Sequence, residues 1–144
     1  MSKFIDRAPD PSNEIQMLSR IGYTLESALS DIIDNSISAD SKSIKIDCLP
    51  TNNKNISWSV TDDGHGMNPQ ELQDNMRIGC KDPSKERERM DLGRFGSGLK
   101  TASISQAKKI TVFSKRANGK ASAARWDVNH VCDKKKWLLE VFSE

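Results

Sequence analysis

The sequence predicts an α+β fold, a two-layer sandwich in which helices pack on one face of a mixed, mainly antiparallel sheet. Three observations support this prediction. Apolar residues recur at helical spacing within residues 11–38, apolar and polar residues alternate in two stretches within residues 44–60, and an Asn-Gly pair at 118–119 separates two further apolar stretches. With 144 residues, 35% of them hydrophobic and 29% charged, the chain has the composition of one globular domain.

Two helices are expected before residue 38. Asp10-Pro11 resembles an N-cap followed by proline at the first helical position. Gly22 divides the apolar-periodic stretch, and Thr24 is expected to cap a second helix. Three polar residues of this second helix are spaced four apart and therefore share one face: Ser27, Asp31 and Asn35.

The rest of the chain alternates between strand and helix signals. Residues 44–48 and 56–60 read as strands joined by a turn, and residues 69–76 read as a short helix that follows a cap and a proline. Residues 80–92 are charged and lack apolar periodicity, so they are expected to form a loop of lid length. A helix should then run from about residue 98 to 106, followed by a hairpin of residues 110–114 and 121–128 and a last strand at 137–142.

Composition restricts the class of protein further. No apolar run is long enough to span a membrane, and the N-terminus lacks the hydrophobic region of a signal peptide. The three cysteines are widely spaced and indicate reduced thiols in a cytoplasmic protein, or a nuclear one if the source is eukaryotic. The net charge of +2 divides into −4 for residues 1–40 and +6 for the remainder, which suits a phosphate ligand, a nucleic-acid surface or ordinary solvated loops.

The face that carries Asp31 and Asn35 is a candidate site for a metal ion and a water molecule. The amide oxygen of Asn35 can ligate a hard divalent cation, and magnesium is usually held by few protein groups together with substrate phosphates. The carboxylate of Asp31, one turn earlier, could orient or deprotonate a water that attacks phosphorus. A polar helix end without any ligand would explain the same residues.

The segment Asp62-Asp63-Gly64-His65-Gly66-Met67 is a candidate for binding a flat base. Asp62 comes at the end of a strand and could accept a hydrogen bond from an exocyclic amine. Gly64 and Gly66 allow a sharp turn and leave room for a ring, and Met67 offers an adaptable apolar surface. An ordinary turn is the alternative, because Asp-Gly is common in turns.

A cluster of glycines at residues 93, 96 and 98 leads into the expected helix at residue 98. Exposed backbone N–H groups and the positive end of a helix favour phosphate, and Arg94 and Lys100 could add charge. A charged loop rather than a strand precedes the glycines, which argues against a Rossmann motif. The sequence also contains no GxxxxGK[ST] run, so the segment is a phosphate-binding loop of another kind.

In their order and spacing these segments resemble the GHKL ATPase superfamily, which includes gyrase B, the Hsp90 chaperones, MutL and the sensor histidine kinases. Asp31 to Asn35 resembles the N box of this superfamily, Asp62 to Met67 its first glycine box, and Gly93 to Thr101 its second. The run from Arg94 to Thr101 is most similar to the MORC-like group. The resemblance covers roughly residues 20–115.

The resemblance implies a Bergerat fold, which binds Mg-ATP between helices and sheet, with residues 80–92 as a nucleotide lid. It implies that Asp31 is catalytic, that Asn35 holds Mg²⁺ and that Asp62 reads adenine. The further nucleotide-binding residues that it implies are Gly64, Gly66, Met67, Asn75, Arg94, Phe95, Gly96, Ser97, Gly98, Leu99, Lys100 and Thr101.

Two departures from the family pattern qualify the expected activity. Asp31 stands where ATP-hydrolysing relatives have glutamate, and losing one methylene retracts the carboxylate by about 1 Å, which can slow a reaction on the order of a hundredfold. The late threonine-containing motif of the family has no match after Phe113. We therefore expect residues 1–144 to form a single ATP-binding domain, the N-terminal part of a longer protein.

The expected function is that of a switch module that binds Mg-ATP, hydrolyses it slowly and changes conformation or dimerises in response. Its expected partners are ATP and ADP, a second copy in a nucleotide-dependent homodimer, and DNA or protein bound through regions outside this chain, without a membrane. The alternatives are a nucleotide-sensing module that does not hydrolyse ATP and the catalytic domain of a histidine kinase.

Overall fold

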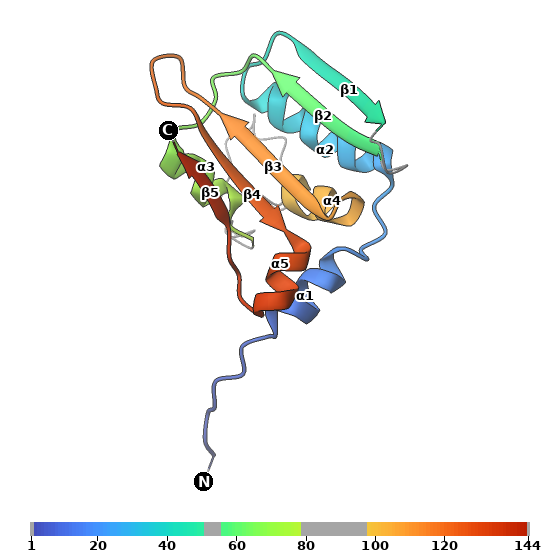
Figure 1. Ribbon diagram of the computed structural model, residues 1–144, viewed down its shortest axis with the longest axis vertical. Helices are drawn as coiled ribbons and strands as arrows, with labels where there is room; N and C mark the ends of the chain where they lie inside the picture. Colours follow the sequence, from blue (N-terminus) through green and yellow to red (C-terminus); the bar gives the residue numbers. More distant parts are fainter. Residues whose placement is uncertain (1, 51–55, 79–97, 144) are drawn as a thin grey trace.

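The computed structural model describes residues 2–50, 56–78 and 98–143, and these residues confirm the expected α+β fold. The strands form one layer and the main helices lie behind it, as Figure 1 shows. The elements are, in order, α1 (Pro11–Leu18), α2 (Leu25–Ser38), β1 (Ile44–Pro50), β2 (Ile56–Asp62), α3 (Pro69–Met76), α4 (Gly98–Gln106), β3 (Lys109–Ser114), β4 (Ser122–Asp127), α5 (Val128–Lys134) and β5 (Glu140–Ser143).

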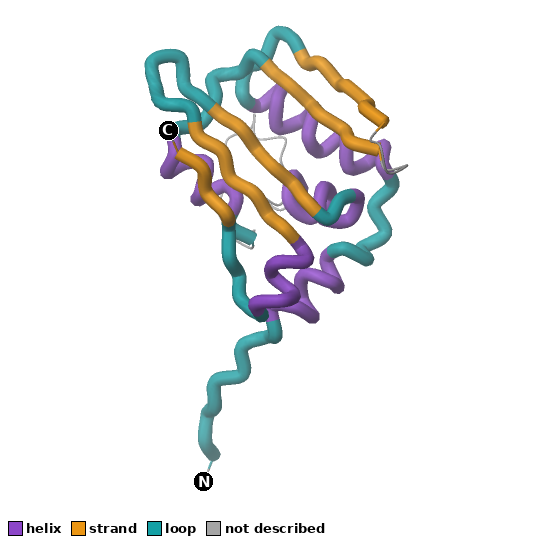
Figure 2. Tube along the Cα trace, in the orientation of Figure 1, coloured by secondary structure: helices purple, strands orange, loops and turns teal. Residues whose placement is uncertain are grey.

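The described strands pair as two antiparallel sheets. β1 pairs with β2, with Ile44 opposite Asp62, and the second sheet has the order β3-β4-β5. Figure 2 shows the strands of both sheets running across the same side of the molecule, with α2 and α4 behind them. The strand pairs are antiparallel as expected, but β2 and β3 belong to separate sheets in the described residues.

The three helix starts that capping residues indicated are confirmed. Asp10 caps α1 by accepting hydrogen bonds from the backbone N–H groups of the first turn, and Thr24 caps α2 through its hydroxyl group. At α3, Asn68 and Glu71 form a reciprocal capping box, which satisfies two backbone donors that would otherwise lack partners. Local side-chain chemistry therefore places the helices that carry the candidate site.

The C-terminal part differs from expectation. The strand expected at 121–128 ends at Asp127, whose carboxylate caps a seven-residue helix, α5, by accepting from Asn129 N and His130 N. α5 was not anticipated, because two turns are too short to display a helical period. The last strand begins at Glu140 rather than at residue 137, after Lys135 ends α5 in a left-handed conformation (φ 51°).

The hydrophobic core lies between the three-stranded sheet and the helices α1, α3, α4 and α5. Among the residues that the structure describes, no member of the buried cluster comes from β1 or β2, so this hairpin is supported mainly by α2 rather than by the main core. No helix within the described ranges has the length and hydrophobicity needed to cross a membrane. The buried cluster consists of Ile15, Leu72, Met76, Ile104, Ile110, Ala124, Trp126, Val128 and Val131.

Candidate functional site

The C-terminal half of α2 supports the first group of candidate residues. Asn35 is exposed, and its side-chain nitrogen donates to the carbonyl of Asp31, 2.6 Å away. This hydrogen bond uses the amide nitrogen and leaves the amide oxygen available as a ligand. Partial burial, together with the charge of Asp34, raises the pKa of Asp31 above its ordinary value. A raised pKa is what a carboxylate needs to accept a proton near neutral pH.

Asp62 lies at the end of β2 and is attached to the same helix. The hydroxyl of Ser36 donates to one carboxylate oxygen of Asp62 at 3.0 Å, and the N–H of Gly64 donates to the other at 3.0 Å. Ser36 is 3% exposed, whereas Asp62 is exposed. The carboxylate is thus oriented by the protein but still accessible to a ligand. Ser36 was not singled out from the sequence, although its position directly after Asn35 turns it toward β2.

The two glycines after Asp62 have structural reasons that differ from the expected clearance for a ring. A Cβ at position 64 would lie 2.7 Å from the Cβ of Ala39 and 2.8 Å from its carbonyl oxygen. Gly66 has a φ of +65°, and a Cβ there would lie 2.2 Å from the carbonyl oxygen of Lys115. Glycine is therefore required at both positions to let this loop contact the end of α2 and the residue after β3.

Met67 and Asn75 are placed by the neighbouring elements. The N–H of Met67 donates to the hydroxyl of Ser114 at 2.8 Å, and its side chain is half-buried against the core cluster. Asn75 is exposed on α3, where its amide nitrogen donates to the carbonyl of Glu71 at 2.9 Å. Met67 thus contributes to the packing of the core, whereas Asn75 lies on the exposed side of α3.

Only the last part of the glycine-rich segment is described. Arg94, Phe95, Gly96 and Ser97 lie outside the described residues, as does the expected lid of residues 80–92. α4 begins at Gly98, as the sequence indicated, and Leu99, Lys100 and Thr101 complete its first turn. Lys100 is 3% exposed, and its ammonium group donates to the carbonyls of Asn75 at 2.7 Å and Arg77 at 2.8 Å.

The described candidate residues therefore fall into two groups. One group joins α2 to the end of β2 through the hydrogen bond from Ser36 to Asp62 and includes Asp31 and Asn35. The other joins α3 to α4 through Lys100 and includes Asn75. In each group the fold brings together candidate residues that are far apart in the sequence, and the motifs had proposed them for one nucleotide site.

The first group is suited to a divalent cation only in combination with a ligand. In the described part of the chain, no group of three or more His, Cys, Asp or Glu side chains is arranged to hold a metal ion. Asn35 offers a single neutral oxygen. This donor set fits magnesium, which commonly takes few protein ligands and completes its coordination with phosphate oxygens and water.

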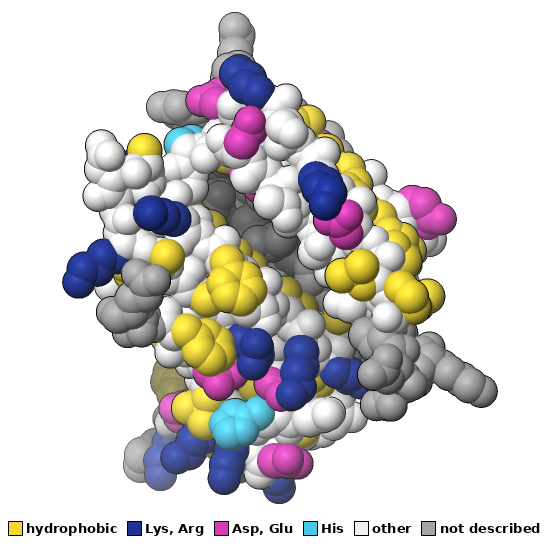
Figure 3. Space-filling model, turned by 45° about the horizontal axis from the view of Figure 1, so that its top comes forward, with side chains coloured by type: hydrophobic (Ala, Val, Ile, Leu, Met, Phe, Trp, Pro, Cys, Tyr) yellow, Lys and Arg dark blue, Asp and Glu magenta, His cyan; other side chains and the backbone are white. Residues whose placement is uncertain are grey.

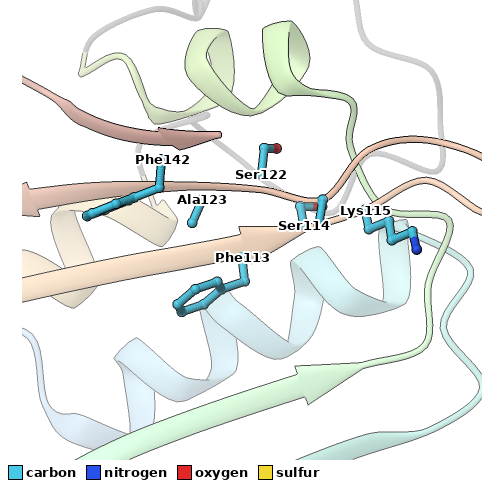
Figure 4. A pocket seen from close by; sticks show the side chains of 7 residues that line it. Phe113, Ser114, Lys115, Ser122, Ala123 and Phe142 are labelled. Atoms are coloured by element: carbon cyan, nitrogen blue, oxygen red, sulfur yellow. The ribbon is translucent and has the colours of Figure 1, made fainter. Parts of the chain in front are cut away.

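A groove of about 450 Å³ lies along the sheet of β3, β4 and β5, where the exposed ring of Phe113 and the ring of Phe142 line it (Figure 4). Phe113 is 79% exposed there, and Arg125 lies over the ring of Phe142 at 5.0 Å from the ring centre. In the space-filling view, hydrophobic side chains are interspersed with charged ones on the face shown (Figure 3). The groove adjoins the candidate residues Gly66 and Met67 through Lys115 and Ser114. It is lined by Phe113, Ser114, Lys115, Ala121, Ser122, Ala123 and Phe142.

The described residues form an α+β domain in which an oriented, exposed carboxylate, that of Asp62, is attached to the helix that carries the Asn35 amide. Residues 23–144 match the family described as "Histidine kinase-, DNA gyrase B-, and HSP90-like ATPase". This match covers well over half of the chain, and the chain belongs to this family. It is an ATP-binding module of that family, as its GHKL motifs indicated.

Two curated relatives are ATPases of the MORC group. The chain is 28% identical to "ATPase morc-1" of Caenorhabditis elegans over 90 residues, which are 62% of this chain and 10% of that protein. It is 30% identical to "ATPase MORC2B" of Mus musculus over 95 residues, which are 63% of this chain and 9% of that protein. The chain thus spans about a tenth of the length of these relatives. The resemblance of the glycine-rich segment to the MORC-like group agrees with this similarity.

Proposed function

We propose that this chain is a Mg-ATP-binding switch module that hydrolyses ATP slowly. The observation that carries the proposal is the attachment of Asp62 to α2 through the buried hydroxyl of Ser36, at 3.0 Å. Ser36 directly follows Asn35, so this bond attaches the proposed base-reading carboxylate of Asp62 to the helical residue next to the proposed metal-binding amide. A nucleotide that contacts both would be bound across the junction between α2 and β2.

In this proposal each candidate residue has a stated role. Asp62 accepts a hydrogen bond from the exocyclic amine of adenine, because each of its oxygens has further acceptor capacity. Asn35 holds magnesium through its amide oxygen, and magnesium when bound neutralises phosphate charge. The N–H groups of the first turn of α4 have no partner within the helix and would favour phosphate. Phosphate and base contacts are completed by Gly64, Gly66, Met67, Asn75, Arg94, Phe95, Gly96, Ser97, Gly98, Leu99 and Thr101.

Asp31 is the proposed general base. Its raised pKa follows from partial burial and the neighbouring charge of Asp34. Its side chain is one methylene shorter than glutamate, so the carboxylate is about 1 Å farther from a water that a glutamate would reach directly. Slow hydrolysis is the expected consequence. Occupancy by nucleotide, rather than rapid turnover, would then drive dimerisation and the action on DNA or protein partners through segments outside this chain.

Binding is tested by thermal unfolding with and without Mg-ATP. A ligand at a hundred times its dissociation constant should stabilise the chain by roughly 2.7 kcal/mol. Asp62→Asn should abolish this stabilisation because the substituted amide presents a donor to the adenine amine. Asp133→Asn, an equivalent change at an exposed position on α5, is the matched control and should respond as the wild type does. If Mg-ATP leaves the unfolding curve of the wild type unchanged, the proposal is wrong.

The choice of aspartate at position 31 also favours a second candidate, a nucleotide sensor that binds ATP without hydrolysing it. Asp31→Glu separates the two. An increase in the rate of phosphate release would support the impaired-base proposal. Zero turnover in both the wild type and Asp31→Glu, with binding intact, would favour the sensor.

A further inference from the structure

The C-terminal end of α3 is held by side chains from two other elements. Its last carbonyl groups, those of Asn75, Met76 and the capping residue Arg77, are consecutive in the chain. Lys100 of α4 donates to the first and third of them at 2.7 and 2.8 Å, and the indole N–H of Trp126 on β4 donates to the second at 2.8 Å. Carbonyls at a helix end have no partner within the helix, so these three side-chain bonds take the place of bonds to water.

The geometry makes Lys100 a suitable group for this end of α3. A helix C-terminus carries partial negative charge, and a cation placed there is stabilised. Burying an ammonium group is costly unless it is hydrogen-bonded, and Lys100 is 3% exposed with two carbonyl acceptors at short distance. Hydrogen bonds from a charged donor are stronger than those between neutral groups. The ammonium group therefore ties α3 to the first turn of α4.

A lysine that follows a glycine-rich phosphate segment would ordinarily be taken as a phosphate contact. Here its charge is directed at the backbone of α3, which lies within the protein. Trp126 acts on the same helix end, carries no charge and is 4% exposed. These two side chains offer a way to distinguish direct contact with phosphate from positioning of α4, because only one of them could bind an anion.

We propose that Lys100 is a positioning residue that fixes the N-terminal turn of α4 against the end of α3, and so places the N–H groups of that turn for phosphate, without contacting phosphate itself. This inference rests on the proposed function of the chain. It predicts that any change that loosens the end of α3 weakens binding of the phosphate part of the nucleotide and leaves binding of the nucleoside part unchanged.

The test measures binding of Mg-ADP and of adenosine by calorimetry, and amide exchange in residues 69–78 by mass spectrometry. Lys100→Met should weaken Mg-ADP binding by about tenfold, as expected when a binding group is displaced by a fraction of an ångström. Adenosine affinity should stay within about twofold of the wild-type value, because adenosine has no phosphate and its base would be held by α2 and β2, which the substitution does not displace. Lys100→Gln, which keeps one donor, should be intermediate. Trp126→Phe should reproduce the selective loss of Mg-ADP affinity.

Amide exchange gives a readout that does not depend on nucleotide. Without ligand, exchange at the end of α3 should accelerate by about tenfold or more in Lys100→Met and in Trp126→Phe, since each variant removes capping hydrogen bonds. Lys108→Met is the matched control, because Lys108 is exposed just after α4 and its removal changes net charge equally. The control should behave as the wild type in both assays.

Three results would overturn the inference. Lys100→Met could weaken Mg-ADP binding while the well-folded Trp126→Phe does not, which would indicate direct contact with phosphate. Adenosine binding could fall as much as Mg-ADP binding, which would indicate a general loss of structure. Exchange at the end of α3 could remain unchanged in Lys100→Met. A wild-type chain that binds no Mg-ADP would instead overturn the proposed function and the phosphate part of this inference, while accelerated exchange would still support the tie between the helices.

Discussion

Replacing Gly66 with alanine should destabilise the folded protein even when no nucleotide is present. The residue has a φ of +65°, where an L side chain brings its Cβ close to the following carbonyl. The added methyl group would also lie 2.2 Å from the carbonyl oxygen of Lys115 and 2.8 Å from its carbonyl carbon. Both neighbours are backbone atoms, so the contact can relax only if the loop or the end of β3 moves.

The expected magnitude follows from these two effects. The left-handed conformation costs an alanine roughly 1–2 kcal/mol. Overpacking that shifts the backbone typically costs about 1–3 kcal/mol more. The free energy of unfolding should therefore fall by about 2–5 kcal/mol, a large part of the 5–15 kcal/mol, roughly, that stabilises a domain.

Urea unfolding followed by tryptophan fluorescence measures this change, because the chain has three tryptophans. Gly119→Ala is the matched control: its Cβ would meet the side chain and carbonyl of Arg116 at 3.5 Å, an ordinary contact. Gly22→Ala has nothing within 4 Å and should be equally harmless. If Gly66→Ala unfolds within about 0.5 kcal/mol of the wild type, the structural requirement for glycine is refuted. Loss of nucleotide binding alone would then favour clearance for a ring.

Three further predictions concern titratable groups. Asp31→Asn should abolish hydrolysis yet stabilise the free protein at neutral pH, because the pKa of Asp31 is raised in the folded state. This stabilisation should shrink as pH falls toward the ordinary pKa of 3.8, and thermal unfolding measured against pH checks it. Glu71→Gln should lower the melting temperature at pH 7 but not at low pH, since the N–H of Asn68 and then Arg116 lower the pKa of Glu71, and that stabilisation is lost as pH falls from 4.5 through the lowered pKa. Asp127→Ala should cost about 1 kcal/mol in urea unfolding by removing the cap of α5, and an unchanged midpoint would show that the cap contributes nothing.

The parts of the fold that could be predicted from sequence are those with local chemical signals. Asp10, Thr24 and Asn68 identify helix starts because each side chain satisfies backbone donors within its own first turn. The Asn-Gly pair at 118–119 correctly indicated the hairpin of β3 and β4. α5 could not be predicted in the same way, because its seven residues follow β4 without a turn and its cap, Asp127, is also the last residue of that strand.

The sequence could propose only those residues of the candidate site whose side chains carry the expected binding chemistry. Asp31, Asn35 and Asp62 are chemically conspicuous, and their spacing carries the family motif. The residues that orient them are not. Ser36 is an ordinary helical serine until β2 is placed beside α2, and Lys100 has the composition of a phosphate ligand until the end of α3 is placed beside α4. Such roles depend on contacts between elements, which no local pattern encodes.

The consecutive residues Asp62 and Asp63 contact different elements, although they have the same side chain. Asp62 is the last residue of β2 and faces α2, where each of its oxygens accepts one hydrogen bond and retains capacity for a ligand. Asp63 instead accepts three hydrogen bonds on one oxygen, from the loop between α2 and β1 at Ser41, Lys42 and Ser43, and these bonds lower its pKa, the one from Ser43 contributing most.

Because Asp62 contacts α2 while Asp63 binds the loop after α2, that loop is part of the candidate site. Asp63 anchors that loop, and Ala39, where α2 ends, accepts a hydrogen bond from the N–H of His65 at 2.9 Å and contacts Gly64. The C-terminal end of α2, which carries Asn35, is thus bound to the segment around Asp62 by two contacts: the hydroxyl of Ser36 donates to Asp62, and the N–H of His65 donates to the carbonyl of Ala39. A change in this loop should therefore alter the distance between the proposed base-reading and metal-binding groups without touching either, and on the proposed function it should weaken nucleotide binding even though Asp62 is unchanged.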